Sequence, residues 1–361
     1  MFLVIMEAKM KILKRILSFI TIIFLMSATL TNYNKKVVSI VSAETKPSKV
    51  AVFLLDFTDD FISEIRQNLE EVQKENPGKV EYTFYDGKTN QAVQDEELDK
   101  VLREGTDLIL MNIVDRAYAK TVIDRIKERN IPVIFFNREP LTPVPIQSYS
   151  RALYIGTDAK TAGELQGKML IDVWNTSKEY IDKNGDNIMQ YFMLEGEGDN
   201  TEAIQRTKYS VATIEKAGIK TQQVSLKICN WREDLAYNAT KSEFEKYKDQ
   251  IEVIIANDDT MAVGSVKALQ EHGYNKGDKS KTIPVVGVDV TPKAKEIIEK
   301  EYMLGSVYQD ARGYAEAMYT CGLNMIEVKS PIEGTEYKLD NTLVSIRLPH
   351  KGYFYINIFA S

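Results

Sequence analysis

The chain has few of the residues on which metal and nucleophilic chemistry most often depends. Its 361 residues include two histidines, His272 and His350, and two cysteines, Cys229 and Cys321. A His-rich zinc site, a four-cysteine cluster and a disulfide scaffold are therefore excluded, and a His-dependent catalytic triad would have to use one of these two histidines. Any chemistry must rest on carboxylates, amides, arginines and aromatic rings.

Phosphate-binding motifs and an excess of positive charge are also absent. No G-x-G-x-x-G follows the first apolar run and no G-x-x-x-x-G-K-[ST] occurs, so nucleotide phosphates lack their usual loop. The 46 basic and 52 acidic residues give a formal net charge of -6, which does not attract a phosphate backbone. We therefore expect no nucleic-acid partner.

Residues 1–43 have the layout of a secretory signal peptide. Four basic residues between Lys9 and Arg15 precede an uncharged apolar run over 16–30, and small residues follow up to Ala43. The alternative is an uncleaved anchor helix, but a membrane span needs about 20 apolar residues and this run is shorter. We expect cleavage and an extracytoplasmic location, at the cell surface or in the periplasm.

Export has two consequences for the remaining chain. The segment carries six basic residues and one acidic residue, so its removal changes the net charge from -6 to about -11. Thr29 stands where a lipoprotein signal would have its lipid-bearing cysteine. Cys229 follows a strand-like run and Cys321 lies in a helical pattern, so we expect two unpaired thiols even in an oxidising compartment.

From Val50 onward, short apolar strands alternate with amphipathic helices, which is typical of a parallel sheet with helical crossovers. Two sets of these units, separated near Gly156-Thr157-Asp158, predict an α/β protein with two doubly wound parallel-sheet lobes. The expected strands are Val50–Leu55, Val80–Tyr85, Leu108–Met111, Val133–Phe136, Met189–Leu194, Gln223–Ile228, Val253–Ala256, Val285–Val288 and Gly305–Tyr308.

Polar side chains follow many of these strands. Ligands of open α/β sheets bind beyond the carboxyl ends of the strands, so the side chains should gather at one edge of each lobe. Asp and Asn at such positions also cap the helices that follow, and capping alone would explain one or two of them. Six strand ends with carboxylates, amides, an arginine and two aromatic residues favour a binding site: Asp56–Phe61, Asn137–Glu139, Cys229–Trp231, Asn257–Asp259, Asp289 and Gln309-Asp310.

A pyranose sugar fits this set of side chains. Asp, Asn and Arg can each bond two neighbouring hydroxyls, which both donate and accept. Flat aromatic rings cover the apolar C–H faces of the sugar and exclude water.

The sequence resembles the galactose/glucose-binding proteins of ABC sugar importers, which are type I periplasmic binding proteins. The resemblance extends from about Lys49 to Pro349 and implies a clamshell, two lobes joined by a hinge. The N-terminal lobe would comprise 49–157 plus 310–344, and the C-terminal lobe 158–309 plus 345–361. The strongest blocks are Asp59-Asp60-Phe61, Val133–Pro140, Gly156-Thr157-Asp158, Ile255–Asp259 and Val286–Asp289.

The resemblance implies ten sugar-binding positions, of which six match the family in residue type. Asp59 and Asp289 would each hold two hydroxyls, and Phe61 and Trp231 would cover opposite ring faces. The other two are Asn137, a hydrogen-bonding amide, and Arg206, on the side of the ring oxygen.

The remaining four positions depart from the family. Its cleft histidine falls on Asn200 and its neighbouring aspartate on Glu202, while two cleft asparagines become Asp258 and Gln309. These changes reshape one end of the pocket. We expect a hexopyranose as the ligand, and the sequence leaves open which sugar it is.

The loop from Asp182 to Gln190 resembles part of a calcium loop. Oxygen-bearing side chains at positions 1, 3, 5 and 9 and a backbone carbonyl at 7 match the first part of an EF-hand, although position 6 is Asn187 and position 12 is Met193. By itself the run is more typical of an ordinary polar turn, since short Asp, Asn and Gly runs usually form turns.

The family it resembles has such a truncated loop, completed by a remote glutamate that falls on Glu252. The resemblance thus implies a structural calcium ion, provided that Asn187 accepts the backbone geometry usual for glycine. The implied ligands are Asp182, Asn184, Asp186, the carbonyl of Ile188, Gln190 and Glu252.

The leading hypothesis is a secreted, monomeric binding protein without catalytic residues. It would close on a galactose- or glucose-like monosaccharide by hinge motion and present it to an ABC permease. Because no lipid-anchor cysteine is present, the alternative is the sugar-sensing subunit of a membrane receptor or sensor kinase.

Two other classes fit less well. A sugar-responsive repressor would need a DNA-binding headpiece before Val50, where the signal-like segment stands. A glycosidase needs two carboxylates flanking the scissile bond. Asp59 and Asp289 could face each other, but carboxylates that grip hydroxyls with both oxygens act as ligands, so we do not expect an enzyme.

Overall fold

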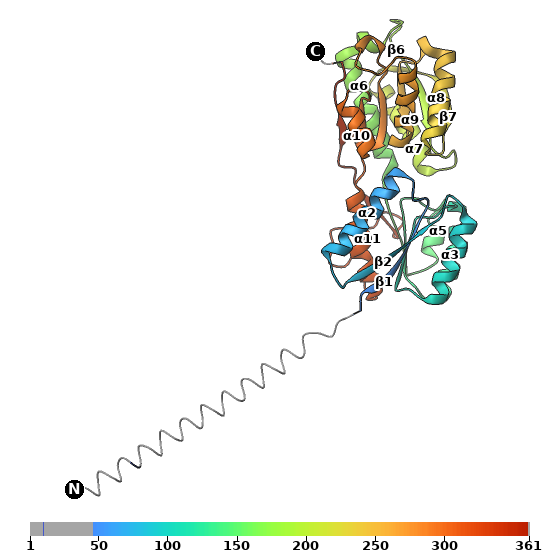
Figure 1. Cartoon of the computed structure of the whole chain (residues 1–361), viewed down its shortest axis with the longest axis vertical. Coiled ribbons are helices and arrows are strands. Elements are labelled where there is room, and N and C mark those ends of the chain that lie inside the picture. The colour runs from blue at the N-terminus through green and yellow to red at the C-terminus, as the bar shows by residue number, and fades with distance from the viewer. Residues whose placement is uncertain (1–9, 11–45, 360–361) are drawn as a thin grey trace, which may run out of the picture. The chain divides into compact units, whose positions relative to one another are not determined.

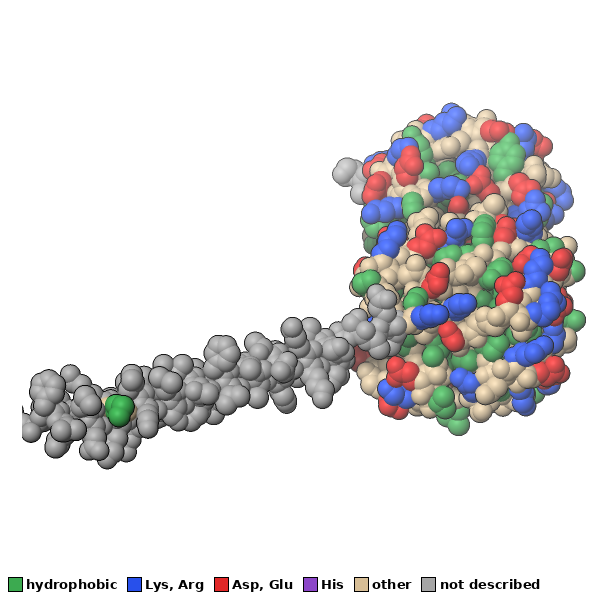
Figure 2. Space-filling view, turned by 60° about the horizontal axis from the view of Figure 1, so that its bottom comes forward, with side chains coloured by type: hydrophobic (Ala, Val, Ile, Leu, Met, Phe, Trp, Pro, Cys, Tyr) green, Lys and Arg blue, Asp and Glu red, His purple; other side chains and the backbone are tan. Residues whose placement is uncertain are grey.

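The computed structural model describes residues 46–359 and Met10. Apart from Met10, the predicted signal peptide lies outside the described residues. All of the elements that follow lie in one unit, Ser48–Ser361. Within the described ranges, no helix has the length and apolar character needed to cross a membrane. On the face shown in Figure 2, acidic and basic side chains are interspersed, unlike the basic stripe of a nucleic-acid binder.

The first lobe is built on a six-stranded, all-parallel sheet in the order β11-β5-β4-β3-β1-β2. Helices α2 (Asp60–Glu75) and α11 (Ala311–Ile326) cover one face, and α3 (Gln91–Glu104) and α4 (Ala119–Glu128) cover the other, with the short α5 (Val144–Gln147) beside them (Figure 1). The strands are β1 (Ser48–Leu54), β2 (Val80–Asp86), β3 (Leu108–Met111), β4 (Val133–Phe136), β5 (Ala152–Thr157) and β11 (Ser345–Leu348).

The second lobe repeats this plan with the order β12-β10-β9-β8-β6-β7, in which only the edge strand β12 is antiparallel. Helices α6 (Ala159–Ile181) and α7 (Thr201–Lys216) cover one face, and α8 (Glu233–Tyr247), α9 (Asp259–Glu271) and α10 (Pro292–Glu299) cover the other. The strands are β6 (Ile188–Glu195), β7 (Lys220–Ile228), β8 (Val253–Ala256), β9 (Val285–Asp289), β10 (Gly305–Tyr308) and β12 (Tyr353–Tyr355).

Helices on both faces explain why the inner strands are apolar throughout rather than alternating, unlike the partly exposed edge strands β2 and β7. In β1, Val50, Val52 and Leu54 pack with α2 and α11, whereas Ala51 and Phe53 pack with α3 and α4. Successive side chains point to opposite faces, and here both faces are buried. The fold is the two-lobed, doubly wound architecture expected from the sequence.

The chain passes between the lobes three times: from β5 to α6, from β10 to α11 and from β11 to β12. The last passage corrects the expected lobe boundary. We expected residues 345–361 in the C-terminal lobe, but β11 pairs in parallel with β5 of the first sheet, from Ser345 opposite Tyr154 to Leu348 opposite Thr157. The chain therefore returns to the second lobe only after Leu348. β5 itself was missing from the expected strands.

The sheet order places the polar strand ends. In the first sheet the order reverses beside β1, which lies between β3 and β2, and in the second beside β6, which lies between β8 and β7. Such reversals are the points at which doubly wound sheets leave a crevice beyond the carboxyl ends of their strands.

Candidate functional site

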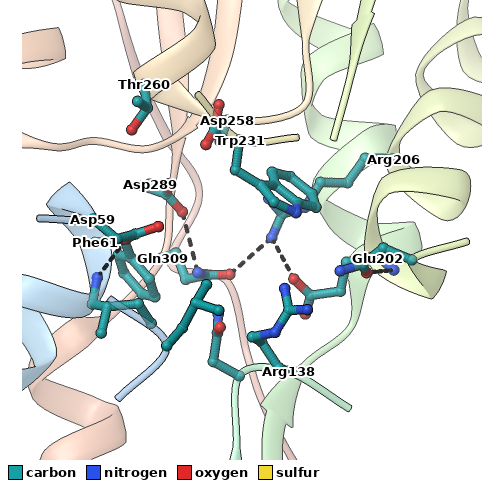
Figure 3. Close-up of a pocket in the computed structure, with 14 residues that line it drawn as sticks. Asp59, Phe61, Arg138, Glu202, Arg206, Trp231, Asp258, Thr260, Asp289 and Gln309 are labelled. Atoms are coloured by element: carbon teal, nitrogen blue, oxygen red, sulfur yellow. Dashed lines mark hydrogen bonds and ion pairs between the residues drawn. The ribbon is translucent and has the colours of Figure 1, made fainter. Parts of the chain in front are cut away.

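One pocket collects all ten residues that the sequence singled out for a sugar, from both lobes (Figure 3). About 510 Å³ of empty space lies inside it, including the part open to solvent. Its lining comprises Asp59, Phe61, Asn137, Asn200, Glu202, Arg206, Trp231, Asp258, Asp289 and Gln309, together with Leu55, Ile62, Arg138 and Thr260, which the prediction did not include.

Three of the polar residues serve as helix N-caps while lining the pocket. Asp59 Oδ1 accepts a hydrogen bond from Ile62 N at 2.9 Å at the start of α2, and Asp258 Oδ1 accepts from Met261 N at 2.9 Å at the start of α9. Asn200 Oδ1 does the same for α7. Capping occupies one carboxylate oxygen of each aspartate. Capping and ligand binding are therefore not alternatives here, because the second oxygen of each remains for a ligand.

A hydrogen-bonded chain crosses the middle of the pocket through Gln309 (Figure 3). Its Nε2 donates to Asp289 Oδ1 at 3.1 Å, and its Oε1 accepts from Arg206 Nη2 at 3.1 Å. Arg206 Nη2 also donates to Glu202 Oε2 at 3.1 Å, and its Nη1 donates to the carbonyl of Asn257 at 2.8 Å. Arg206 is only 2% exposed, so these contacts fix its guanidinium as a rigid donor group.

The two aromatic residues of the pocket come from different lobes. Phe61 lies in the first turn of α2 and packs edge-on against Tyr314, with the ring centroids 6.0 Å apart. Trp231 follows β7, where Asn230 and Trp231 adopt φ values of 50° and 63°. A Cβ at Gly196 would come within 2.3 Å of the Trp231 ring, so this glycine makes room for the indole.

Asn137 and Arg138 follow β4 at the edge of the first lobe. Asn137 has φ 57°, in the left-handed region that asparagine tolerates, and its Oδ1 accepts from Asn112 Nδ2 at 3.1 Å. The side-chain amide of Asn137 is thereby oriented before any ligand arrives.

Arg138 links the two lobes at the pocket wall. Its Nε donates to the carbonyl of Ile113 at 2.7 Å and its Nη2 to that of Val114 at 2.8 Å, both in the first lobe. Its Nη1 reaches Glu197 Oε2 of the second lobe at 3.0 Å, and Asn200 Nδ2 donates to the same oxygen at 3.1 Å. In the sequence, Arg138 stands between Asn137 and Glu139 at the end of an expected strand. Nothing in the sequence showed that its side chain would point toward the second lobe.

The pocket brings several buried carboxyl groups close together. Burial raises the pKa of Asp59 to about 6, and the nearby carboxylates of Asp60 and Asp56 add to the rise, whereas the Ile62 amide and Arg138 oppose it. Burial likewise raises the pKa values of Asp258 and Asp289 well above the ordinary range, with Arg206 opposing both. Such carboxylates gain most from ligand groups that donate hydrogen bonds.

The predicted calcium loop lies between α6 and β6, with Glu252 beside it. Glu252 Oε1 accepts from Lys183 N at 3.0 Å and Oε2 from Gln190 N at 3.2 Å, while Asp186 Oδ2 accepts from Gln190 Nε2 at 2.8 Å. Asn187 has φ 63°, so it does adopt the backbone geometry usual for glycine. Over residues 46–359 and Met10, no group of three or more His, Cys, Asp or Glu side chains is arranged to hold a metal ion.

Two oxygens of this loop are nevertheless left over. Asp182 Oδ1 and Gln190 Oε1 are buried and have no hydrogen-bond partner among the described residues. Burial raises the pKa of Glu252 to about 7, and the carboxylates of Asp182 and Asp186 add to the rise. An oxygen-only donor set with surplus buried oxygens is chemically suited to a hard cation. To bind one, the carboxylates would have to rotate away from the amide groups that now donate hydrogen bonds to them.

Both cysteines are free and buried, as expected from their positions. Burial raises the pKa of each thiol to about 12, so neither is a thiolate at neutral pH.

Comparison with known proteins identifies the architecture. Residues 50–330 match the model of the family described as periplasmic binding protein domain. The D-galactose/methyl-galactoside binding periplasmic protein MglB of Haemophilus influenzae is 32% identical over 306 residues, which cover 84% of this chain and 89% of that protein. The D-ribose/D-allose-binding protein of Pseudomonas aeruginosa is 23% identical over 301 residues, or 81% of this chain and 87% of that protein.

Solved structures share the fold. An ABC transporter solute binding protein of Bacillus halodurans with bound myo-inositol superimposes with a TM-score of 0.69 at 19% identity, covering 87% of this chain and 96% of that one. A periplasmic solute binding protein of Actinobacillus succinogenes with bound D-allose gives a TM-score of 0.69 at 18% identity, covering 84% and 96%. The chain therefore belongs to the periplasmic binding protein family, whose members are extracytoplasmic solute receptors and not enzymes.

Proposed function

We propose that this protein captures a hexopyranose of the galactose and glucose type between its lobes and delivers it to an ABC importer. The observation that carries the proposal is the convergence of ten residues from both lobes on one pocket, with two aromatic rings, four carboxylates and a buried arginine among them. A sugar offers what these groups lack, namely hydroxyl donors for the carboxylates and apolar C–H faces for the rings.

The pocket's hydrogen-bonding inventory supports a neutral, hydroxyl-rich ligand. Asp59, Asp258 and Asp289 are acceptors when ionised and would repel an anionic ligand. Arg206 provides positive charge, but Glu202 and the Gln309 amide already share its Nη2. A sugar acid or a phosphorylated sugar would therefore bind less well than the parent hexose.

The relatives support the same ligand class. The Haemophilus influenzae relative is named for D-galactose and methyl-galactoside, and the Pseudomonas aeruginosa relative for D-ribose and D-allose. This pocket departs from the galactose/glucose pattern at four positions, Asn200, Glu202, Asp258 and Gln309. The protein would therefore differ from the galactose/glucose-binding proteins in the hexose epimer that it prefers.

A thermal-shift screen tests the ligand class. The protein would be heated with each of a panel of hexoses, pentoses, hexuronates and myo-inositol, and a neutral hexopyranose should give the largest rise in Tm. A larger rise with a pentose or a hexuronate would overturn the hexose assignment. Unchanged nitrophenyl glycosides after prolonged incubation would agree with a binding role, whereas their hydrolysis would contradict it.

The partner is proposed from the family alone. An importer should be stimulated by the loaded protein when it is reconstituted in vesicles, which would be seen as sugar-dependent ATP hydrolysis. Co-purification with a sensor-kinase ectodomain, without that stimulation, would instead favour a sensing role.

We also propose that the loop from Asp182 to Gln190, together with Glu252, binds a structural calcium ion. Support comes from the two buried oxygens that lack a partner and from the three carboxylates that lie near one another. A bound cation would offset the repulsion among these carboxylates and would stabilise the fold. The loop residues are absent from the lining of the sugar pocket, so the ion would have no direct part in ligand binding.

A further inference from the structure

The peptide segment that presents Asp289 to the pocket has an unfavourable backbone geometry. Asp289 has φ 121° and the next residue, Val290, has φ 60°. Both values lie in the region that favours glycine, and for a β-branched residue this conformation is a genuine outlier. Such a conformation is strained, and it persists only when the surrounding structure enforces it.

A buried pair of side chains holds this segment in place. Ser306 Oγ, on β10, accepts a hydrogen bond from Val290 N at 3.0 Å and donates to Asp259 Oδ1 at 2.6 Å. Asp259 Oδ2, at the start of α9, accepts from Thr291 N at 2.8 Å. The two amides that follow Asp289 are thus both bonded by one Asp259–Ser306 unit.

The pair is completely enclosed, and the adjacent strand is shaped around it. Asp259 and Ser306 are each 0% exposed. A Cβ on Gly287, two residues before Asp289 in β9, would lie 2.3 Å from Asp259 Oδ1, so a glycine is required for the carboxylate to come this close. Neither Asp259 nor Ser306 belongs to the pocket lining described above.

We propose that Asp259 and Ser306 are positioning residues that set ligand affinity and selectivity by fixing the Asp289 carboxylate in the pocket. This inference rests on the proposed function, since it assigns a role to residues that would not touch the sugar. If Ser306 loses its hydroxyl, the Val290 amide loses its acceptor and the strained turn can relax. Asp289 would then leave the position in which Gln309 Nε2 and the sugar meet it.

Ser306→Ala is the primary test, with Ser265→Ala as its matched control. Ser265 is also a fully buried serine of the second lobe, on α9, but its Oγ has no hydrogen-bond partner within the described residues. Affinity for the preferred hexose, measured by titration calorimetry, should fall about 10-fold in Ser306→Ala and stay within about twofold in Ser265→Ala. Equal affinities in the wild type and Ser306→Ala would overturn the proposal.

A double-mutant cycle separates positioning from general destabilisation. If Ser306 acts through Asp289, Ser306→Ala should add little to the loss already caused by Asp289→Asn. Full additivity of the two losses would show that Ser306 acts elsewhere and would contradict the proposal.

Hydrogen exchange of the ligand-free protein gives a readout that needs no sugar. The amides of Val290 and Thr291 should exchange at least about 10-fold faster in Ser306→Ala and in Asp259→Asn, while those of β8 keep their protection. Unchanged exchange at both amides would overturn the positioning role even if a sugar binds. Absence of sugar binding by the wild type, with faster exchange in the variants, would instead reject the proposed function and keep the structural basis of this inference.

Discussion

Arg138 of the first lobe donates a hydrogen bond to Glu197 of the second across 3.0 Å, at the wall of the pocket. Both groups are charged, and Arg138 is only 7% exposed. Because Arg138 is also anchored to two backbone carbonyls of its own lobe, this ion pair couples the spacing of the lobes to the geometry of the pocket. It can exist only while the lobes are together.

Glu197→Gln should therefore weaken ligand binding mainly by speeding release. The closed state loses a charge-assisted contact that an open state does not have, and we expect an increase of about 10-fold in the dissociation rate with little change in the association rate. Stopped-flow fluorescence measures both rates. Asp99→Asn, which removes the exposed partner of Arg125 within the first lobe, serves as the control. A slower association rate with unchanged release would contradict this account.

Asp59→Ala should reduce affinity by about 100-fold, because it removes a buried, charged acceptor for ligand hydroxyls. It also removes the N-cap of α2, so Asp59→Asn is the better-matched variant, since asparagine still caps the helix. Lys246→Ala, on an exposed face of α8, should leave the affinity unchanged. Calorimetric titration distinguishes these cases, and wild-type affinity in Asp59→Asn would show that the carboxylate is not a ligand.

Trp231 should report on ligand binding through its fluorescence. The chain has two tryptophans, and Trp174 is buried in the core of the second lobe, away from the pocket lining. In a Trp174→Phe background, a bound sugar should change the emission of Trp231 in a saturable way. Trp231→Ala should lose the signal and at least about 10-fold in affinity, because stacked area and water exclusion are both lost. A sugar that binds without altering Trp231 emission would place the ligand elsewhere.

Affinity should rise with pH between about 5 and 7. The pKa of Asp59 is raised from 3.8 to about 6, so at pH 5 the carboxyl is largely protonated in the ligand-free fold. A sugar hydroxyl that donates to Asp59 favours the ionised form, so binding near pH 6 should release protons. Calorimetry in buffers of different ionisation enthalpy measures this release. Asp59→Asn should flatten the pH profile; an unaltered profile in that variant would assign the effect to other groups.

The raised pKa of Asp59 affects the stability of the fold in the opposite direction from ligand affinity. Since the folded, ligand-free protein binds a proton at Asp59 more tightly than the unfolded chain does, this group's contribution to stability declines as pH rises from 3.8 through about 6. Ligand should counteract this decline, so the increase in Tm caused by sugar should be larger at pH 7 than at pH 5.

Calcium should raise Tm and a chelator should lower it. Glu252→Gln should abolish the response to calcium, because it removes one of the three carboxylates next to the loop. Glu179→Gln, an exposed change near the end of α6, should keep the response. A Tm that is independent of calcium in the wild type would reject the metal site and leave the sugar proposal unaffected.

The sequence predicted most of the fold because the strands are apolar runs between amphipathic helices, and both faces of each sheet are covered. It missed β5 because Ala152–Thr157 ends in Gly156-Thr157, which looked like the break between two sets of units. It misplaced β11 because that strand's position depends on pairing with β5, almost 200 residues earlier, which no local pattern shows.

Seven of the ten predicted pocket residues were predictable because they follow strand ends, where ligands of doubly wound sheets bind. Asn200, Glu202 and Arg206 came only from the family resemblance, and Arg206 lies inside α7. What could not be predicted is how these side chains interact with one another. The bridge from Asp289 through Gln309 to Arg206, and the reach of Arg138 to Glu197, depend on the relative placement of the two lobes. The role of Ser306 was equally hidden, since a buried serine in a short strand has no distinguishing sequence signal.

Calorimetric titration of the wild-type protein with D-galactose and D-glucose tests the central claim most directly. We predict saturable binding of at least one of them, with one sugar per chain and a dissociation constant of about 1 µM or lower. Folded protein that gives no binding heat with either hexose at several temperatures would contradict the claim that this pocket is built for a hexopyranose.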